Sequence, residues 1–370
     1  METGTRREPL LTTLLIYPTS RCNLKCRHCY FAPTYEAQPG NRADEISYEQ
    51  ICRAIDDLLP FGLDTCKLSG GEPFLREDVM GICCYADCRG LGVIIETNGT
   101  LVQKHQADVL AQLRRKPFVS VSIDGATAAT HEALRGVPGS FEAALQGLAH
   151  LVGVGLNVQV IAAAYEGNKG ELPQIMDLAA AKGAKSFKVC FVNRVGRARN
   201  LSLLGRDEAL ALDAQLTAHA RQAGIRYCSS IPVGLKSARE ILDTCALNGR
   251  CNVNSTLGLL ADGTITICGM GRYTPDFRFG RLGQDDLATL WATHPTLQLI
   301  RDGIPGKLGG VCGRCVARTA CLGHCRIDNE NVTLRTFFDP FVACAEMESL
   351  GRFPKSRIIE RRLAAVPRVA

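Results

Sequence analysis

Short apolar runs rich in β-branched residues alternate with longer amphipathic stretches over the first 225 residues of the chain. The runs predict six strands, at residues 14–20, 65–70, 93–99, 118–125, 157–165 and 186–196. The amphipathic stretches predict helices at residues 48–61, 76–89, 105–115, 141–154, 171–182 and 206–223. Repeated strand-then-helix units predict a parallel sheet with right-handed crossovers, whose chemistry lies on the loops that follow the strands.

The pattern changes after about residue 226, where cysteines become dense and the alternation of strands and helices stops. Apolar runs at 256–260 and 264–268 flank Ala261-Asp262-Gly263, which predicts a β-hairpin. A single helix is expected at about 287–301, whereas the Gly- and Cys-rich stretch 309–326 shows little periodicity. This stretch has so few apolar core positions that burial of apolar surface alone is not expected to stabilise it. We therefore expect a crosslink of another kind to hold it together.

Composition narrows the class of protein. The 370 residues are 46% hydrophobic and 22% charged, and the net charge of +6 is spread along the chain, which argues against nucleic acid as a partner. Neither a membrane span nor a signal peptide is predicted. The 18 cysteines are the anomaly. In a cytoplasmic protein, which we expect here, clustered thiols usually bind metals or act in catalysis.

The first cysteine cluster directly follows the first predicted strand. Cys22, Cys26 and Cys29 form a C-x3-C-x2-C motif on one loop, with no fourth cysteine nearby. Three thiolates suit a [4Fe–4S] cluster with one iron left open, as catalytic metal sites keep an open position. Zinc would require a fourth ligand, and His28 lies between two of the cysteines, where it is poorly placed to share their metal.

This motif resembles the defining motif of the radical S-adenosylmethionine (SAM) superfamily. The resemblance implies a partial (β/α)6 barrel in which Cys22, Cys26 and Cys29 hold the cluster and SAM chelates the open iron. His28 would then lie near the adenine. The activity implied is reductive cleavage of SAM to a 5′-deoxyadenosyl radical, which abstracts hydrogen from a substrate.

Segments after the next strands also resemble family segments. The second strand is followed by Gly70, Gly71, Glu72 and Pro73, similar to the segment that receives the SAM ammonium group. Glycines allow close approach of the backbone, and Glu72 offers a carboxylate. The same four residues taken alone would also suit an ordinary turn.

The third and fourth strands end near Asn98, Ser122 and Asp124, on segments that resemble those lining the ribose and substrate side of the cavity. Arg135 resembles the arginine that meets the SAM carboxylate. An arginine at a helix end that is capped by Gly136 is the alternative interpretation.

The C-terminal cysteines resemble those of a SPASM domain with an additional upstream ligand, Cys245. By family correspondence they form two groups of four thiolates, the ligand count of two auxiliary [4Fe–4S] clusters. The groups are Cys245, Cys251, Cys268 and Cys325, and Cys312, Cys315, Cys321 and Cys344. Structural zinc is the competing interpretation.

Some of the remaining cysteines have simpler interpretations. Cys52, Cys83, Cys84 and Cys88 lie on predicted helices and are expected to be small core residues. Cys190 lies near the end of the sixth strand and is expected to face the cavity.

These inferences give a fold class and a division of the chain. We expect an α/β protein: a partial (β/α)6 barrel followed by a small Cys-rich SPASM domain with a β-hairpin and two auxiliary clusters. The division is a tail at 1–13, the barrel at 14–225, the SPASM domain at 226–350 and a basic tail at 351–370.

The resemblance favours a ribosomally made peptide as substrate, with crosslink, thioether, epimerised or otherwise oxidised products. A flavodoxin or ferredoxin would supply electrons. Only about a dozen residues precede the first strand, so a separate protein, the barrel mouth or the basic tail is expected to bind a leader. Arg194 and Arg197 are candidates for peptide contacts, and solvated arginines are the simpler interpretation.

Other functions remain open. A tetrapyrrole or an amino sugar is the alternative substrate. A sulfatase maturase is less favoured, because the position after Cys268 is Gly269 where such enzymes carry aspartate. A zinc-bound interaction protein with a vestigial barrel is the third hypothesis, and the intact C-x3-C-x2-C motif argues against it.

Overall fold

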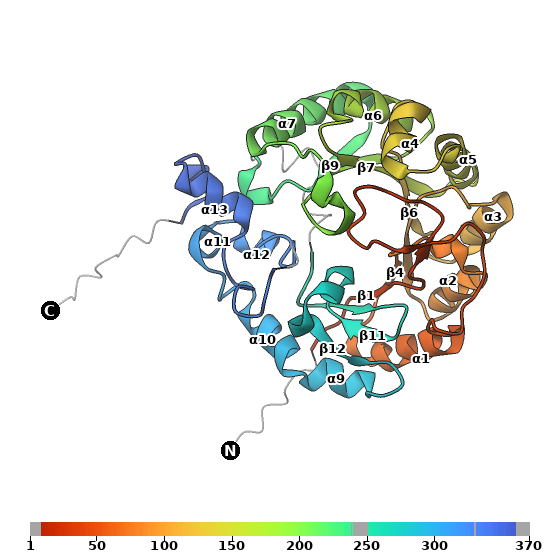
Figure 1. Ribbon diagram of the computed structural model, residues 1–370. Coiled ribbons are helices and arrows are strands. Elements are labelled where there is room, and N and C mark those ends of the chain that lie inside the picture. The colour runs from red at the N-terminus through yellow and green to blue at the C-terminus, as the bar shows by residue number, and fades with distance from the viewer. Residues whose placement is uncertain (1–8, 238, 240–250, 329–330, 360–370) are drawn as a thin grey trace, which may run out of the picture.

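The computed structural model describes residues 9–237, 239, 251–328 and 331–359. Its main feature is one ten-stranded sheet in the order β12-β11-β10-β1-β4-β5-β6-β7-β8-β9. Figure 1 shows the strands on the inside of an incomplete ring, with helices on the outside. Among the described residues no helix is both long and apolar enough to span a membrane.

The barrel strands are parallel and joined by helical crossovers. They are β1 (Thr13–Ile16), β4 (Thr65–Leu68), β5 (Gly92–Thr97), β6 (Phe118–Ser122), β7 (Asn157–Ala164), β8 (Ser186–Phe191) and β9 (Arg226–Ser229). The helices are α1 (Tyr48–Leu58), α2 (Val79–Cys88), α3 (Lys104–Gln112), α4 (Ala128–Arg135), α5 (Ser140–Gly153), α6 (Leu172–Ala181) and α7 (Arg206–Ala223). All six predicted strands and all six predicted helices of this half are present, with ends displaced by a few residues.

The C-terminal half continues the same sheet. β10 (Thr256–Leu259) pairs in parallel with β1, and β11 (Thr264–Thr266) and β12 (Arg278–Arg281) follow as antiparallel strands. The predicted hairpin is therefore confirmed, but β9 and β12 were not predicted. The expected single helix at 287–301 was wrong. It is divided into α9 (Leu287–Thr293) and α10 (Pro295–Gly303), because Pro295 begins a new helix and cannot continue the old one.

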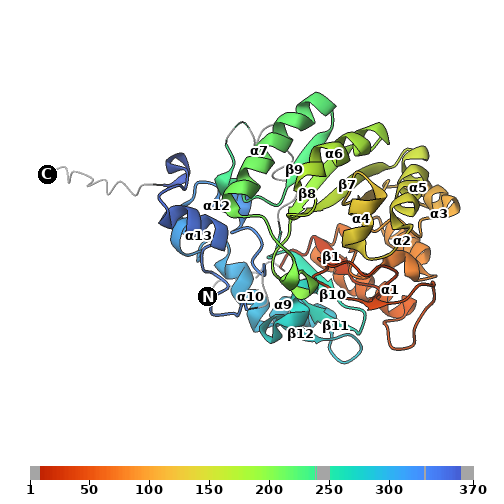
Figure 2. The ribbon, with the colours of Figure 1, turned by 45° about the horizontal axis from the view of Figure 1, so that its top comes forward.

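Short elements complete the chain. They are β2 (Arg21–Cys22), β3 (Thr34–Tyr35), α11 (Gly310–Arg314), α12 (Arg318–Cys321) and α13 (Val342–Ser349). Figure 1 shows that α10 to α13 lie on the side of the ring that the barrel strands leave open, between β12 and α7, whereas α9 lies next to α1. The same placement of α10, α12 and α13 is visible in Figure 2.

The two faces of the barrel sheet differ in polarity, as strand alternation requires. The face toward the helices is buried and apolar, for example at Ile95, Val121 and Val160. The face toward the lumen carries polar side chains, including Glu96, Ser120 and Gln159, which are aligned across β5, β6 and β7. In closed (β/α)8 barrels, layers of apolar side chains fill the interior. A polar lumen therefore indicates space used for binding.

A buried ion pair links the end of the barrel to the C-terminal region. The Lys236 ammonium lies 2.8 Å from Asp213 on α7, and Tyr227 donates a hydrogen bond to the same carboxylate. Both charged side chains are almost fully buried. The backbone carbonyl of Lys236 in turn accepts a hydrogen bond from Arg357.

This network gives a stability prediction. Lys236→Met leaves the Asp213 carboxylate buried without its counter-charge, so the free energy of unfolding should fall by about 3–5 kcal/mol. The double variant Lys236→Met/Asp213→Leu removes both charges and should recover most of that loss. Urea unfolding of the three proteins measures the effect, and equal losses in the single and double variants would contradict it.

Candidate active site

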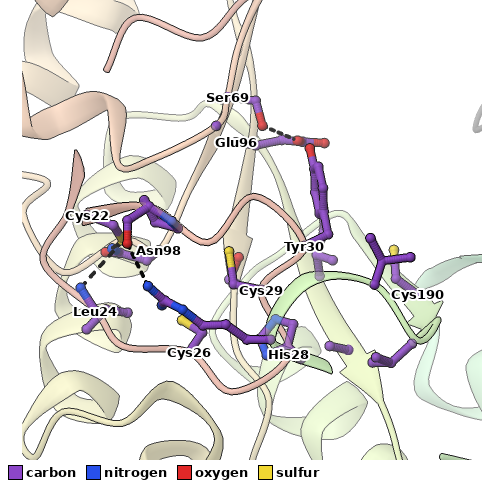
Figure 3. Close-up of a pocket in the computed structure, with 18 of the residues that line it drawn as sticks. Cys22, Leu24, Cys26, His28, Cys29, Tyr30, Ser69, Glu96, Asn98 and Cys190 are labelled. Carbon is purple, nitrogen blue, oxygen red and sulfur yellow. Dashed lines mark hydrogen bonds between the residues drawn. The ribbon is translucent and has the colours of Figure 1, made fainter. Parts of the chain in front are cut away.

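The loops after β1, β4, β5, β6 and β8 meet around one cavity of about 380 Å³. Figure 3 shows Cys22, Cys26 and Cys29 around this cavity together with His28 and Asn98. Of the predicted SAM contacts, His28, Gly70, Gly71, Glu72, Asn98, Ser122 and Arg135 line it. Pro73 and Asp124 do not appear on its wall: both are buried behind it.

The cysteine loop is fastened to the end of α4. The backbone N–H groups of Lys25 and Arg27 donate to the carbonyls of Arg135 and Leu134, at 3.0 and 2.9 Å. Gly136 has φ +74°, and a Cβ there would lie 2.8 Å from the Lys25 carbonyl oxygen. Arg135 is the last residue of α4 and is followed by the capping Gly136, as one interpretation predicted. It also lines the cavity, as the interpretation as a SAM contact requires.

Hydrogen-bond donors surround the cysteine sulfurs. The Leu24 N–H lies 3.4 Å from the Cys22 sulfur, and the Asn98 amide nitrogen lies 3.9 Å from it. The Arg135 guanidinium lies 3.6 Å from the Cys26 sulfur. Burial is the main cause that raises the pKa of Cys22 to about 12, so this thiol ionises only when a cation compensates its charge.

Asp124 holds Arg135 rather than facing the cavity. Its carboxylate accepts from Arg135 Nε at 2.5 Å and from the Ala163 N–H at 2.7 Å. Burial opposes ionisation, but Arg135 and these donors still leave the pKa of Asp124 below its usual range. Asp124 was expected on the ribose side, but it is not among the residues that line the cavity, and its carboxylate is bound to the buried Arg135 guanidinium.

Glu72 connects the loop after β4 to the end of β5. Its carboxylate accepts from the Phe74 N–H, the Thr97 hydroxyl and the Asn98 N–H, at 3.1, 2.7 and 2.8 Å. Burial raises its pKa to about 7 despite these donors. Gly71 is required beside it, since a Cβ would lie 1.9 Å from the Arg21 carbonyl oxygen. Pro73 was expected to contact SAM, but it begins a buried helical turn at Pro73–Leu75.

The residues present fit an iron–sulfur cluster with SAM. Cys22, Cys26 and Cys29 are not in disulfides, they border the same cavity, and the buried His28 Nδ1 has no hydrogen-bond partner in the structure. In the described residues no three His, Cys, Asp or Glu side chains converge where one metal ion could bind. A cubane does not require convergence, because each thiolate binds a different iron.

Sequence reasoning missed much of the lumen. Ser69, Glu96 and Lys188 line the cavity, as does Cys190, which was predicted to do so. Glu96 pairs with Lys67 at 2.7 Å and accepts from Ser69 at 2.8 Å. The signal was available in two strands, because polar or thiol side chains recur at every second position: Thr65 and Lys67 of β4 followed by Ser69, and Ser186, Lys188 and Cys190 of β8.

The C-terminal cysteines gather in two places. Cys251, Cys268 and Cys325 lie close enough to interact electrostatically, and Cys325 also lines the cavity. Cys245 lies outside the described residues. The other four, Cys312, Cys315, Cys321 and Cys344, border a separate cavity of about 20 Å³.

Three side expectations have clear outcomes. Cys52 and Cys83 are buried and Cys84 is half-buried, but Cys88 is exposed at the end of α2, so its assignment to the core was wrong. Arg197 lines the cavity and donates to the Pro33 carbonyl. Arg194 is exposed and donates to the Arg199 carbonyl.

Comparison with known proteins places this site in a family. Residues 16–179 match the radical SAM superfamily. The AdoMet-dependent heme synthase of Methanosarcina barkeri is 29% identical over 330 residues, covering 83% of this chain and 89% of that protein. Mycofactocin maturase MftC of Mycobacterium tuberculosis is 26% identical over 315 residues, covering 83% and 76%.

A solved structure shares the fold. The crystal structure of Streptococcus suis SuiB bound to S-adenosylmethionine matches with a TM-score of 0.69 at 17% identity, covering 91% of this chain and 77% of that one. SuiB has also been crystallised with its precursor peptide SuiA, and that structure matches with a TM-score of 0.67. Residues 16–179 of the chain therefore form a radical SAM domain.

Proposed function

We propose that the chain cleaves SAM reductively and uses the resulting radical to abstract hydrogen from a residue of a ribosomally made peptide, giving a crosslinked, thioether, epimerised or otherwise oxidised product. The observation that carries the proposal is one cavity bordered by Cys22, Cys26 and Cys29 and by Glu72, Asn98, Ser122 and Arg135. When bound there, a [4Fe–4S] cluster with SAM supplies one electron to the sulfonium and yields a 5′-deoxyadenosyl radical.

The chain's own residues hold and orient these groups. Cys22, Cys26 and Cys29 would bind the cluster, and nearby donors from Leu24, Asn98 and Arg135 stabilise negative charge on two of the sulfurs. The Glu72 carboxylate would face the SAM ammonium, and Ser122 a ribose hydroxyl. The unpartnered Nδ1 of His28 offers a hydrogen bond to the adenine.

We also propose two auxiliary [4Fe–4S] clusters. The proximity of Cys251, Cys268 and Cys325 supports the first, for which Cys245 would be the fourth ligand. The shared cavity of Cys312, Cys315, Cys321 and Cys344 supports the second. Because Cys325 also borders the active-site cavity, the first auxiliary cluster would be placed to accept an electron from a substrate radical. A flavodoxin or ferredoxin in the cytoplasm would supply the reducing electron.

The relatives support two substrate classes. A peptide is supported by the fold shared with SuiB, which has been crystallised with a precursor peptide, and by the maturase MftC. A separate leader-binding protein would then assist recognition. A small molecule, namely a tetrapyrrole, is the second candidate, because the heme synthase relative aligns over 83% of this chain.

The substrate class can be decided directly. Anaerobic holoenzyme with SAM and dithionite is incubated with short peptides encoded beside its gene, or with an iron tetrapyrrole. Mass spectrometry should find a peptide altered by loss of hydrogen or epimerised with solvent deuterium, together with 5′-deoxyadenosine above the rate without peptide. If the enzyme converts the tetrapyrrole and none of the peptides, the proposed peptide substrate is wrong and the tetrapyrrole takes its place.

The cysteine loop gives a prediction on iron content. Wild-type protein reconstituted with iron and sulfide should hold about twelve iron atoms per chain, and Cys26→Ala about eight. Cys26→Ala should form no 5′-deoxyadenosine, because the SAM-binding cluster lacks a ligand. Cys88→Ala is the matched control: Cys88 is exposed on α2, and its loss should change neither quantity. Production of 5′-deoxyadenosine by Cys26→Ala would refute the assignment.

The ion pair behind the cavity gives a further prediction. Asp124→Asn removes the charge that orients Arg135, so the SAM dissociation constant should rise about tenfold while the iron content stays that of wild type. Equilibrium dialysis with labelled SAM measures the constant, and iron analysis reports the cluster. Unchanged SAM binding in Asp124→Asn would show that Arg135 needs no partner to hold its position.

A further inference from the structure

Lys188 occupies a position in the lumen that neither the cysteine loop nor the SAM contacts explain. Strand register aligns Ser122 on β6 with Ile161 on β7, Ile161 with Lys188 on β8, and Lys188 with Cys228 on β9. Lys188 and Ser122 line the same cavity. The lysine therefore projects into the lumen from the wall that lies two strands beyond the predicted ribose contact.

The neighbouring acid is already paired with another lysine. The Glu96 carboxylate lies 2.7 Å from the Lys67 ammonium and accepts from the Ser69 hydroxyl at 2.8 Å. Burial by itself would raise the pKa of Glu96. The charges of Lys67 and Lys188 and the hydrogen bond from Ser69 outweigh burial and lower this pKa to about 2. Two ammonium groups thus interact with the Glu96 carboxylate, but only that of Lys67 forms an ion pair with it. Glu72 and Asp328 also line the cavity, as do Arg135 and Arg197.

Within the described residues, no carboxylate comes within 4.0 Å of Lys188 and no hydrogen bond of its ammonium is found. The other titratable groups that face it are the thiols of Cys190 and Cys228 and the imidazole of His324. An imidazole carries no negative charge in either of its usual protonation states, so His324 offers no counter-charge to Lys188. Taking an ammonium out of water without a partner is costly, and an anion that enters the cavity would offset that cost.

We propose that Lys188 binds a carboxylate of the substrate and fixes its position in the lumen. This inference rests on the proposed function, in which a substrate shares the cavity with SAM. The shared chemistry is a carboxylate on a flexible arm. In a peptide it is an Asp or Glu side chain or a free C-terminus, and in a tetrapyrrole it is a propionate.

The main competing role for Lys188 is as counter-ion to the first auxiliary cluster, whose proposed ligand Cys325 borders the same cavity. The two roles differ in what they change. A substrate anchor sets the preference for acidic over neutral ligands, whereas a counter-ion alters the spectrum and potential of the auxiliary cluster.

The test measures binding to anaerobic holoenzyme with SAM and without reductant, so that it does not depend on SAM cleavage. Two probe pairs distinguish the carboxylate sources: coproporphyrin III against its tetraamide, and a fluorescent acetylated peptide with one Glu against the same peptide with Gln. The proteins are wild type, Lys188→Gln, Lys188→Arg and the control Lys182→Gln, which removes an exposed lysine beyond α6.

Wild type should bind the acidic member of at least one pair about tenfold or more tightly than the neutral member. Lys188→Gln should abolish that preference, Lys188→Arg should retain much of it, and Lys182→Gln should not affect it. The pair that shows the effect identifies the carboxylate source. The proposal is overturned if wild type shows no preference for the acidic ligand, or if Lys188→Gln retains that preference. A variant Lys188→Gln that retains the preference and changes only the EPR spectrum of the auxiliary cluster would assign Lys188 the counter-ion role instead. Absence of 5′-deoxyadenosine in a separate reduced sample would instead count against the proposed function.

Discussion

The parallel pairing of the barrel strands is the constraint on which the site depends. Each strand from β1 to β8 in the sheet runs in the same direction, so the loops that carry the cysteines, Glu72, Asn98 and Arg135 all emerge at one edge. Residues from five separate stretches of sequence thereby border one cavity. The close contact of Gly71 with the Arg21 carbonyl and the hydrogen bonds of Glu72 then fix the first loops against one another. Precise placement follows from backbone geometry, before any cofactor binds.

Several charged side chains in and around the barrel are held in ion pairs. Asp124 holds Arg135 beside the Cys26 sulfur, Lys67 holds Glu96, and Lys236 holds Asp213. Such pairs do little for stability in themselves, but removing one partner is costly, so they fix conformation. In the lumen, Lys188 forms no such ion pair within the described residues. A catalytic cavity commonly leaves one charge for its ligand to complete, and this is the basis for expecting an acidic group on the substrate.

The sequence was most informative where the period of the pattern was regular. The six strands and six helices predicted up to residue 225 were correct in type and order, because their apolar residues recur with a regular period. The helix α4 and the two-residue strands β2 and β3 were not predicted. The cysteine loop could be predicted from spacing alone. Asp124 could not be assigned correctly, because its partner Arg135 is eleven residues away and only the fold shows that they meet. Lys188 was missed because candidate residues were sought on the loops that follow the strands, whereas Lys188 lies within β8 on the face that lines the lumen. β9 and β12 were missed because neither sequence, Arg-Tyr-Cys-Ser or Arg-Phe-Gly-Arg, contains a β-branched residue.

The central claim is that the sulfurs of Cys22, Cys26 and Cys29 hold a cluster whose open iron binds SAM. Electron–nuclear double resonance on dithionite-reduced holoenzyme, with SAM labelled with ¹⁵N in its amino group and ¹⁷O in its carboxylate, tests this most directly. The account predicts hyperfine coupling of both labels to the reduced cluster, and loss of both couplings in Cys29→Ala. A reduced, iron-replete protein that shows neither coupling would contradict it.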